Sequence, residues 1–159
     1  MNKSFLQSKK FIEAIVNEHQ ADSTRIGIMG ISMGAITAGG IFADNLGVKC
    51  LVGINGTFAW QESIKRNYLP ATTEDNKESI EHYDPMNNED KIKERAILIL
   101  HGTEDTSVPI ESQRAFYNKM RPQYIKNPKR FEFIEESNVN HRVTTGMLQE
   151  AVRWFKEQL

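Results

Sequence analysis

The sequence predicts an α/β fold, in which helices flank a mainly parallel sheet of about four strands. Short apolar runs alternate along the chain with segments whose apolar residues recur at helical spacing. Most of these runs lack polar alternation, as strands do when helices cover both faces of a parallel sheet. Because strands that alternate with helices pair through right-handed crossovers, residues 1–159 are expected to form a single domain.

The first two expected elements are a helix and a strand. Residues 4–19 predict an amphipathic helix, because their apolar side chains recur at spacings close to seven, three and four. These side chains are Phe5, Ile12, Ile15 and Val16. After a turn-rich stretch, residues 25–29 form a short apolar run that ends at Gly30. The run is typical of a buried strand, and the glycine indicates a turn after it.

A second helix and a second strand follow. Residues 33–46 are apolar nearly all round, which predicts a helix that packs between other elements. Gly39 and Gly40 each lower helix propensity by about 1 kcal/mol, so close packing is expected to compensate for them. Residues 48–54 are an unalternating apolar run and predict a buried strand.

Residues 55–88 fit this alternation least well and are expected to be an insertion. The segment is polar and long for a connection, so we expect one or two short helices that lie over the sheet. Its aromatic residues are Phe58, Trp60 and Tyr68. Aromatic side chains in such a segment either join the core or line a ligand pocket, and the sequence leaves both interpretations open.

The remaining elements continue the alternation. Residues 96–100 predict a third buried strand, and a helix begins at Pro109 and continues to about residue 120. Residues 130–135 alternate apolar and polar side chains, which favours an edge strand. Residues 143–155 predict a terminal helix.

Composition excludes several classes of function. The 20 Lys and Arg residues and 21 Asp and Glu residues give a net charge of -1, so no global positive field recruits nucleic acid or an anionic membrane. The single cysteine, Cys50, excludes internal disulfides and a zinc site of several thiolates, and we expect it to be a small packed residue. No apolar run approaches the roughly 18 residues of a membrane span, and polar residues interrupt the N-terminus where a signal peptide would be apolar. We therefore expect a cytoplasmic protein with no metal site, no nucleic-acid partner and no membrane span.

Residues 30–34, with the sequence Gly-Ile-Ser-Met-Gly, form a GxSxG motif between a predicted strand and a predicted helix. This context is typical of a nucleophile elbow, a sharp turn that holds a serine, here Ser32, at strained backbone angles. The turn is expected to leave room only for glycine two positions before and after the serine. The Met33 amide, at the start of the helix, is placed to stabilise an oxyanion. Serine alone is too weak an acid to attack an ester, so it needs a base.

A second motif, His-Gly-Thr-Glu-Asp-Thr-Ser-Val-Pro at residues 101–109, follows a predicted strand. Together with the GxSxG motif, this HGxxDxxVP pattern resembles the α/β-hydrolase superfamily, and specifically its dienelactone hydrolase, prolyl oligopeptidase and small carboxylesterase branches. The resemblance extends from Arg25 to the C-terminus. It implies that Asp105 is the acid of a catalytic triad, with Glu104 as the second choice.

Among the four histidines, only His141 follows the acid in a loop between a predicted strand and a predicted helix. It completes the chain order of serine, acid and histidine that this fold uses. The family often has glycine before this histidine, where this chain has Asn140. His101 is expected to brace the acid loop, whereas His19 and His82 are expected at the surface.

The resemblance implies a serine hydrolase that cleaves small-molecule carboxylic esters through an acyl-enzyme on Ser32, without a cofactor. His141 would act as base and acid, and Met33 would contribute an oxyanion-hole donor. Phe58 and Trp60 are the candidate substrate-binding residues. The alternative is a truncated, non-catalytic hydrolase scaffold that acts as an interaction or regulatory domain. Acyl transfer or peptide cleavage by the same triad is a third interpretation.

The same resemblance predicts a truncated α/β-hydrolase fold, the C-terminal portion of the usual one, because only 31 residues precede Ser32. The early strands, and the loop that supplies a second oxyanion donor, have no counterpart in this sequence. The strand over residues 25–29 would then lie at an edge with unpaired backbone groups and exposed apolar faces. We expect a homodimer partner, the chain's own N-terminal helix or a missing N-terminal segment of a longer protein to cover this edge.

Overall fold

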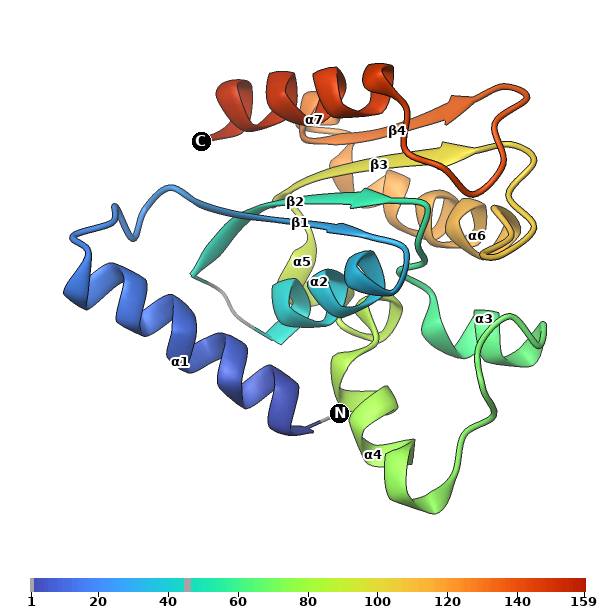
Figure 1. The fold of residues 1–159 in the computed structure, drawn as a ribbon, viewed down its shortest axis with the longest axis horizontal. Helices are drawn as coiled ribbons and strands as arrows, with labels where there is room; N and C mark the ends of the chain where they lie inside the picture. The colour runs from blue at the N-terminus through green and yellow to red at the C-terminus, as the bar shows by residue number, and fades with distance from the viewer. Residues whose placement is uncertain (1, 45–46) are drawn as a thin grey trace.

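A parallel sheet forms the centre of the computed structural model, which describes residues 2–44 and 47–159 and in these ranges has four strands in the order β1-β2-β3-β4 (Figure 1). The strands are β1 (Ile26–Ile31), β2 (Val48–Ile54), β3 (Ala96–Gly102) and β4 (Phe131–Glu136). Every neighbouring pair is parallel. The predicted α/β architecture is therefore confirmed.

Helices lie on both sides of this sheet. The α-helices are α1 (Asn2–Glu18), α2 (Met33–Asp44), α3 (Trp60–Lys65), α4 (Glu74–Tyr83), α5 (Glu89–Ile92), α6 (Glu111–Met120) and α7 (Thr145–Gln158). The 3-10 helices are η1 (Pro85–Asn87), η2 (Arg121–Tyr124) and η3 (Pro128–Arg130). Figure 1 shows α7 on one face of the sheet and α2 and α6 on the other.

The two faces of the sheet form separate cores because successive side chains of a strand point to opposite faces. Leu51 and Ile97 pack with Phe42 of α2 and Phe116 of α6. Residues with the opposite orientation pack with Met147, Ala151 and Trp154 of α7. These oppositely oriented residues are Cys50, Val52, Ile54, Leu98 and Leu100. Burial on both faces explains why the central strands read as continuous apolar runs.

Element boundaries differ from the predicted ones by a few residues. The strand predicted over residues 96–100 continues to Gly102, and the helix predicted from Pro109 begins at Glu111. The terminal helix is displaced toward the C-terminus, because the Thr144 side chain accepts a hydrogen bond from Met147 N and caps it. The second helix is described as far as Asp44, so its predicted end at Leu46 lies outside the described residues.

The segment over residues 55–88 contains α3, α4 and η1, which agrees with the prediction of short helices. Across the described ranges, no helix combines the length and the apolar character that a bilayer crossing requires.

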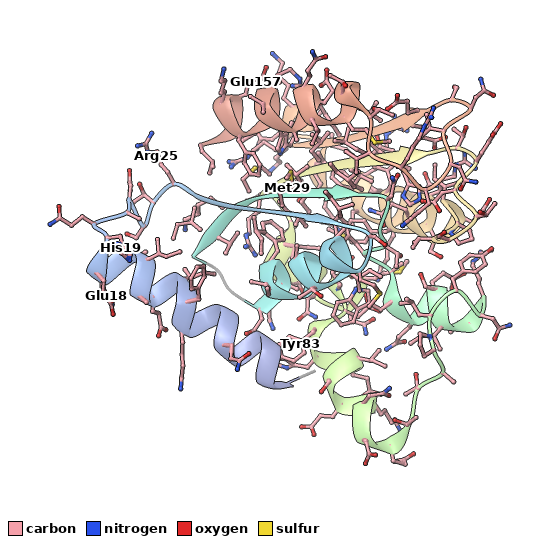
Figure 2. The ribbon with its side chains drawn as sticks, in the orientation of Figure 1. Glu18, His19, Arg25, Met29, Tyr83 and Glu157 are labelled. Carbon is pink, nitrogen blue, oxygen red and sulfur yellow. The ribbon has the colours of Figure 1, made fainter. Side chains whose placement is uncertain are left out.

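Strand β1 lies at one edge of the sheet. Ile12 of α1 and Ile28 of β1 both pack against the cluster that contains Ile36 and Ile41 of α2, whereas Phe5 lies where side chains are not described. Met29, labelled in Figure 2, and Ile31 alternate with Ile28 along β1 and so point to the other side. They are 44% and 43% exposed. Helix α1 therefore lies on the same side of β1 as α2, and apolar residues on the other side of β1 remain exposed.

Candidate active site

The first component of the site is a tight turn between β1 and α2 that carries Ser32. Ser32 has a φ of 54°, in the left-handed region that costs a non-glycine residue roughly 1–2 kcal/mol. Its N–H donates to the carbonyl of Ile54 at 2.8 Å, and its own carbonyl accepts from Ala35 N at 2.9 Å and Ile36 N at 3.2 Å. These bonds hold Ser32 in this strained conformation.

The two glycines of the motif have different roles in this turn. A Cβ on Gly30 would lie 2.1 Å from the carbonyl oxygen of Gly34 and 2.5 Å from Ala35 N, so only glycine fits at position 30. A Cβ on Gly34 would have no heavy atom within 4 Å. The expectation that the turn needs glycine at both positions is therefore wrong for Gly34. Crowding acts at the Cβ of residue 30, and Gly34 contributes only the backbone that this Cβ would meet.

The second and third components are loops that follow β3 and β4. His141, after β4, places Nε2 2.9 Å from Ser32 Oγ and Nδ1 2.8 Å from Asp105 Oδ2. Asp105, after β3, is buried, and its other carboxylate oxygen accepts from Ser107 N at 2.9 Å and Val108 N at 2.8 Å. The three predicted side chains therefore form one continuous chain of hydrogen bonds.

The parallel sheet explains how residues so distant in sequence meet. Ser32, Asp105 and His141 each follow a different strand, β1, β3 and β4. All strands point the same way, toward the right of Figure 1, so the loops after them gather at one edge.

A family model described as the prolyl oligopeptidase family matches residues 2–159, essentially the whole chain. The chain belongs to the prolyl oligopeptidase family. This places it in the α/β-hydrolase superfamily that its two motifs resemble.

Two curated proteins are related to this prolyl oligopeptidase family member. YitV of Bacillus subtilis (strain 168), which carries an esterase name, is 27% identical over 150 residues, covering 87% of this chain and 59% of the relative. Esterase YjfP of Escherichia coli (strain K12) is 26% identical over 156 residues, covering 92% of this chain and 61% of the relative. The chain thus spans about three fifths of the length of these relatives.

Solved structures share the fold of this family member at lower identity. TT1662 from Thermus thermophilus has a TM-score of 0.79 at 18% identity, covering 97% of this chain and 61% of that structure. The acylaminoacyl peptidase of Pyrococcus horikoshii has a TM-score of 0.74 at 21% identity, covering 98% of this chain and 27% of that structure. At these identities the likeness concerns the fold alone.

Glu104 and His101 are the other two residues of the 101–109 motif for which the sequence predicted a role. Glu104 is exposed, and Asp105 contacts His141, so the second choice for the acid is not supported. His101 is fully buried, and its Nε2 donates to the carbonyl of Val108 at 2.8 Å, within the loop that it was expected to brace. Its Nδ1 has no hydrogen-bond partner among the described residues.

Burial lowers the pKa of His101 below its ordinary value, because a protonated ring would be desolvated. The unfolded chain therefore binds a proton more readily than the folded chain does. Stability from this residue is present above the ordinary pKa of about 6.5 and is lost as pH falls through the folded pKa.

We expect the melting temperature of the wild type to fall more steeply than that of His101→Gln between pH 8 and pH 5.5. Differential scanning calorimetry across this range measures both slopes, and the other three histidines are common to both proteins. Parallel curves would show that His101 carries no such linkage.

The candidate substrate-binding residues Phe58 and Trp60 lie in the core. They are 1% and 2% exposed, so the structure favours the core interpretation of these aromatics over the pocket interpretation. The Phe58 ring fills the space that Gly39 and Gly53 leave, since a Cβ on either would lie 2.6 Å or closer to it. Asp84 accepts hydrogen bonds from Trp60 N and Gln61 N at 3.1 and 2.9 Å and holds the start of α3 inward. Their burial therefore does not support the substrate-binding role for which Phe58 and Trp60 were the candidates.

The other predicted residues take the positions expected of them. Cys50 is buried, and burial raises the pKa of its thiol to about 12, so it is a packed residue and a poor nucleophile. His19 and His82 are exposed, and His82 Nε2 lies 3.1 Å from Asp44 Oδ1. Met33 is the first residue of α2, where a helix leaves its backbone N–H without an intrahelical acceptor.

Gly102, for which the sequence alone predicted no role, allows two loops to come together. A Cβ on Gly102 would lie 2.3 Å from the carbonyl oxygen of Val139, two residues before His141. The absence of a side chain at position 102 thus lets the histidine loop approach the end of β3. The HGxxDxxVP motif contained this signal.

Proposed function

We propose that this chain carries the catalytic residues of a serine hydrolase that cleaves carboxylic esters through an acyl-enzyme on Ser32. The observation that supports it most is the chain of contacts from Ser32 Oγ through the His141 imidazole to the buried Asp105 carboxylate. The esterase names of two relatives support acyl transfer to water, although these relatives are longer than this chain.

The geometry assigns a role to each ring nitrogen of His141. Nδ1 keeps its proton and donates a hydrogen bond to Asp105, which can only accept when ionised, so Nε2 has a free lone pair toward Ser32 Oγ. As Oγ bonds to the ester carbonyl carbon, Nε2 takes the hydroxyl proton. The charge on the carbonyl oxygen develops beside the N-terminus of α2, where the Met33 N–H is the proposed donor.

Collapse of this intermediate breaks the bond to the alcohol, which leaves with the proton from His141 Nε2. Water then attacks the acyl carbon and gives a proton to Nε2. As the bond from the acyl carbon to Oγ breaks and the acid is released, Nε2 returns this proton to Oγ and regenerates Ser32. Asp105 keeps its negative charge throughout and stabilises the protonated imidazole. The His141 side chain is 26% exposed, so water can reach this ring.

A fluorophosphonate probe tests the proposal, because it labels only an activated serine. We expect the wild type and Ser137→Ala, a control at an exposed serine, to be labelled at neutral pH and Ser32→Ala to remain unlabelled. Circular dichroism melts confirm that all three proteins are folded. Folded wild type without labelling would contradict the proposal and favour the non-catalytic scaffold.

The family description favours peptide cleavage as a second candidate reaction for the same residues. A p-nitrophenyl ester and a p-nitroanilide with the same acyl group separate the two reactions. Turnover of the ester alone supports the proposed esterase, whereas turnover of both at similar rates supports a peptidase. A homodimer partner or a preceding segment at the β1 edge, and a cytoplasmic location, remain proposals that accompany this function.

A further inference from the structure

We infer that Asn55 is a positioning residue for the Ser32–His141 pair and that both ends of its side-chain amide are needed. The inference rests on the proposed function, because it assigns Asn55 a role in that reaction. Asn55 follows β2 directly and is 1% exposed, so water does not replace its hydrogen bonds.

The amide of Asn55 connects two loops that carry the site. Its Nδ2 donates to the carbonyl of Arg142, the residue after His141, at 2.8 Å. Its Oδ1 accepts from the N–H of Gly102, at the start of the acid loop, at 3.0 Å. A donor on one side and an acceptor on the other determine which end of the amide is nitrogen.

The backbone beside Asn55 connects the remaining component of the site, the turn that carries Ser32. The carbonyl of Ile54 accepts the N–H of Ser32 at 2.8 Å, and the N–H of Asn55 donates to Leu100 at 2.9 Å. One buried residue at the end of β2 therefore sets the relative positions of the serine turn, the acid loop and the histidine loop. Strand β2 contributes no side chain to the hydrogen bonds among Ser32, His141 and Asp105. Its end contributes to the site through Asn55, which holds the surrounding loops in place.

The side-chain amide of Asn140 forms hydrogen bonds through its oxygen, whereas that of Asn55 uses both ends, so the two residues can be compared. In the described part of the chain the hydrogen bonds of the Asn140 amide all use Oδ1, which accepts from Thr106 N at 3.1 Å, Thr106 Oγ1 at 3.2 Å and His141 N at 2.6 Å. A carboxylate oxygen can accept the same three bonds. At Asn55 a carboxylate would instead turn an acceptor toward the Arg142 carbonyl, and two acceptors repel.

Asparagine to aspartate is therefore the informative change at each position. Asn55 has a φ of 49°, and aspartate tolerates this left-handed region as asparagine does. The same change at Asn67, an exposed residue after α3 with a φ of 60°, is the matched control for backbone and charge.

We expect Asn55→Asp to lower kcat for a p-nitrophenyl ester by about 10²-fold with little change in KM, since a misplacement of about 1 Å costs this much. The loss of kcat in Asn140→Asp is expected to be smaller by a factor of about ten or more, and Asn67→Asp is expected to keep the kcat of the wild type. If Asn55→Asp fails to fold, Asn55→Gly keeps the left-handed backbone, adds no charge and is expected to show the same loss of kcat. A folded Asn55 variant with wild-type kcat would overturn the inference.

A second measurement separates this inference from the proposed function. The Nδ1 proton of His141, bonded to Asp105, gives a low-field proton NMR signal whether or not the chain turns over substrate. We expect the signal in wild type and Asn67→Asp, and its loss or broadening in folded Asn55→Asp. If wild type shows the signal but is neither labelled nor active, only the proposed function fails. If an active wild type and Asn55→Asp share a sharp signal and equal kcat, only the positioning role fails.

Discussion

Replacing His141 with alanine is expected to lower kcat for ester hydrolysis by about 10⁶-fold, the loss typical when the serine or histidine of a triad is removed. Without the imidazole the Ser32 hydroxyl loses its proposed proton acceptor, because Nε2 lies 2.9 Å from Oγ. The side chain is partly exposed, so we expect a folded variant. Steady-state kinetics with a p-nitrophenyl ester measure the loss.

His19→Ala is the matched control, since it removes an exposed imidazole from the chain. It is expected to keep wild-type kcat. A His141→Ala variant that retains activity within about tenfold of the wild type would exclude His141 as the general base, because base catalysis alone contributes about 10²-fold or more.

Replacing Gly30 with alanine is expected to destabilise the fold by about 3 kcal/mol or more, at the upper end of overpacking costs. The new methyl would lie 2.1 Å from a backbone oxygen, and backbone cannot move aside as a flexible side chain can. For a chain of this length the loss corresponds to a melting temperature lower by about 6–12 °C. Thermal unfolding by circular dichroism measures it.

Gly34→Ala is the control for this prediction, since it makes the same change four residues later in open space. Because alanine has the higher helix propensity, Gly34→Ala is expected to keep or raise stability by up to about 1 kcal/mol. Equal destabilisation of both variants would contradict the crowding that we assign to Gly30. Neither glycine has a positive φ, so the difference between them concerns space and not backbone freedom.

Much of the site follows from local sequence. The strand before Gly30 and the helix after Ser32 identify the serine turn. The resemblance of residues 101–109 to the HGxxDxxVP pattern implies Asp105, and chain order then identifies His141. These predictions succeed because a parallel sheet brings the loops after its strands to one edge. The positions of Phe58 and Trp60 could not be predicted in this way. Whether an aromatic ring is buried depends on the space that distant residues leave, here the missing side chains of Gly39 and Gly53.

The sequence by itself determined the α/β architecture and the identity of the three side chains that meet after β1, β3 and β4, because periodicity and motif order are local properties of a chain. The tertiary structure alone decided that Glu104 faces solvent, that Gly34 is uncrowded and that Asn55 connects Gly102 to Arg142. The two contacts of Asn55 join it to residues that lie 47 and 87 positions away in the chain. Hydrogen bonds and steric contacts of this kind act only over a few ångströms, so they exist only once the sheet has brought those segments together.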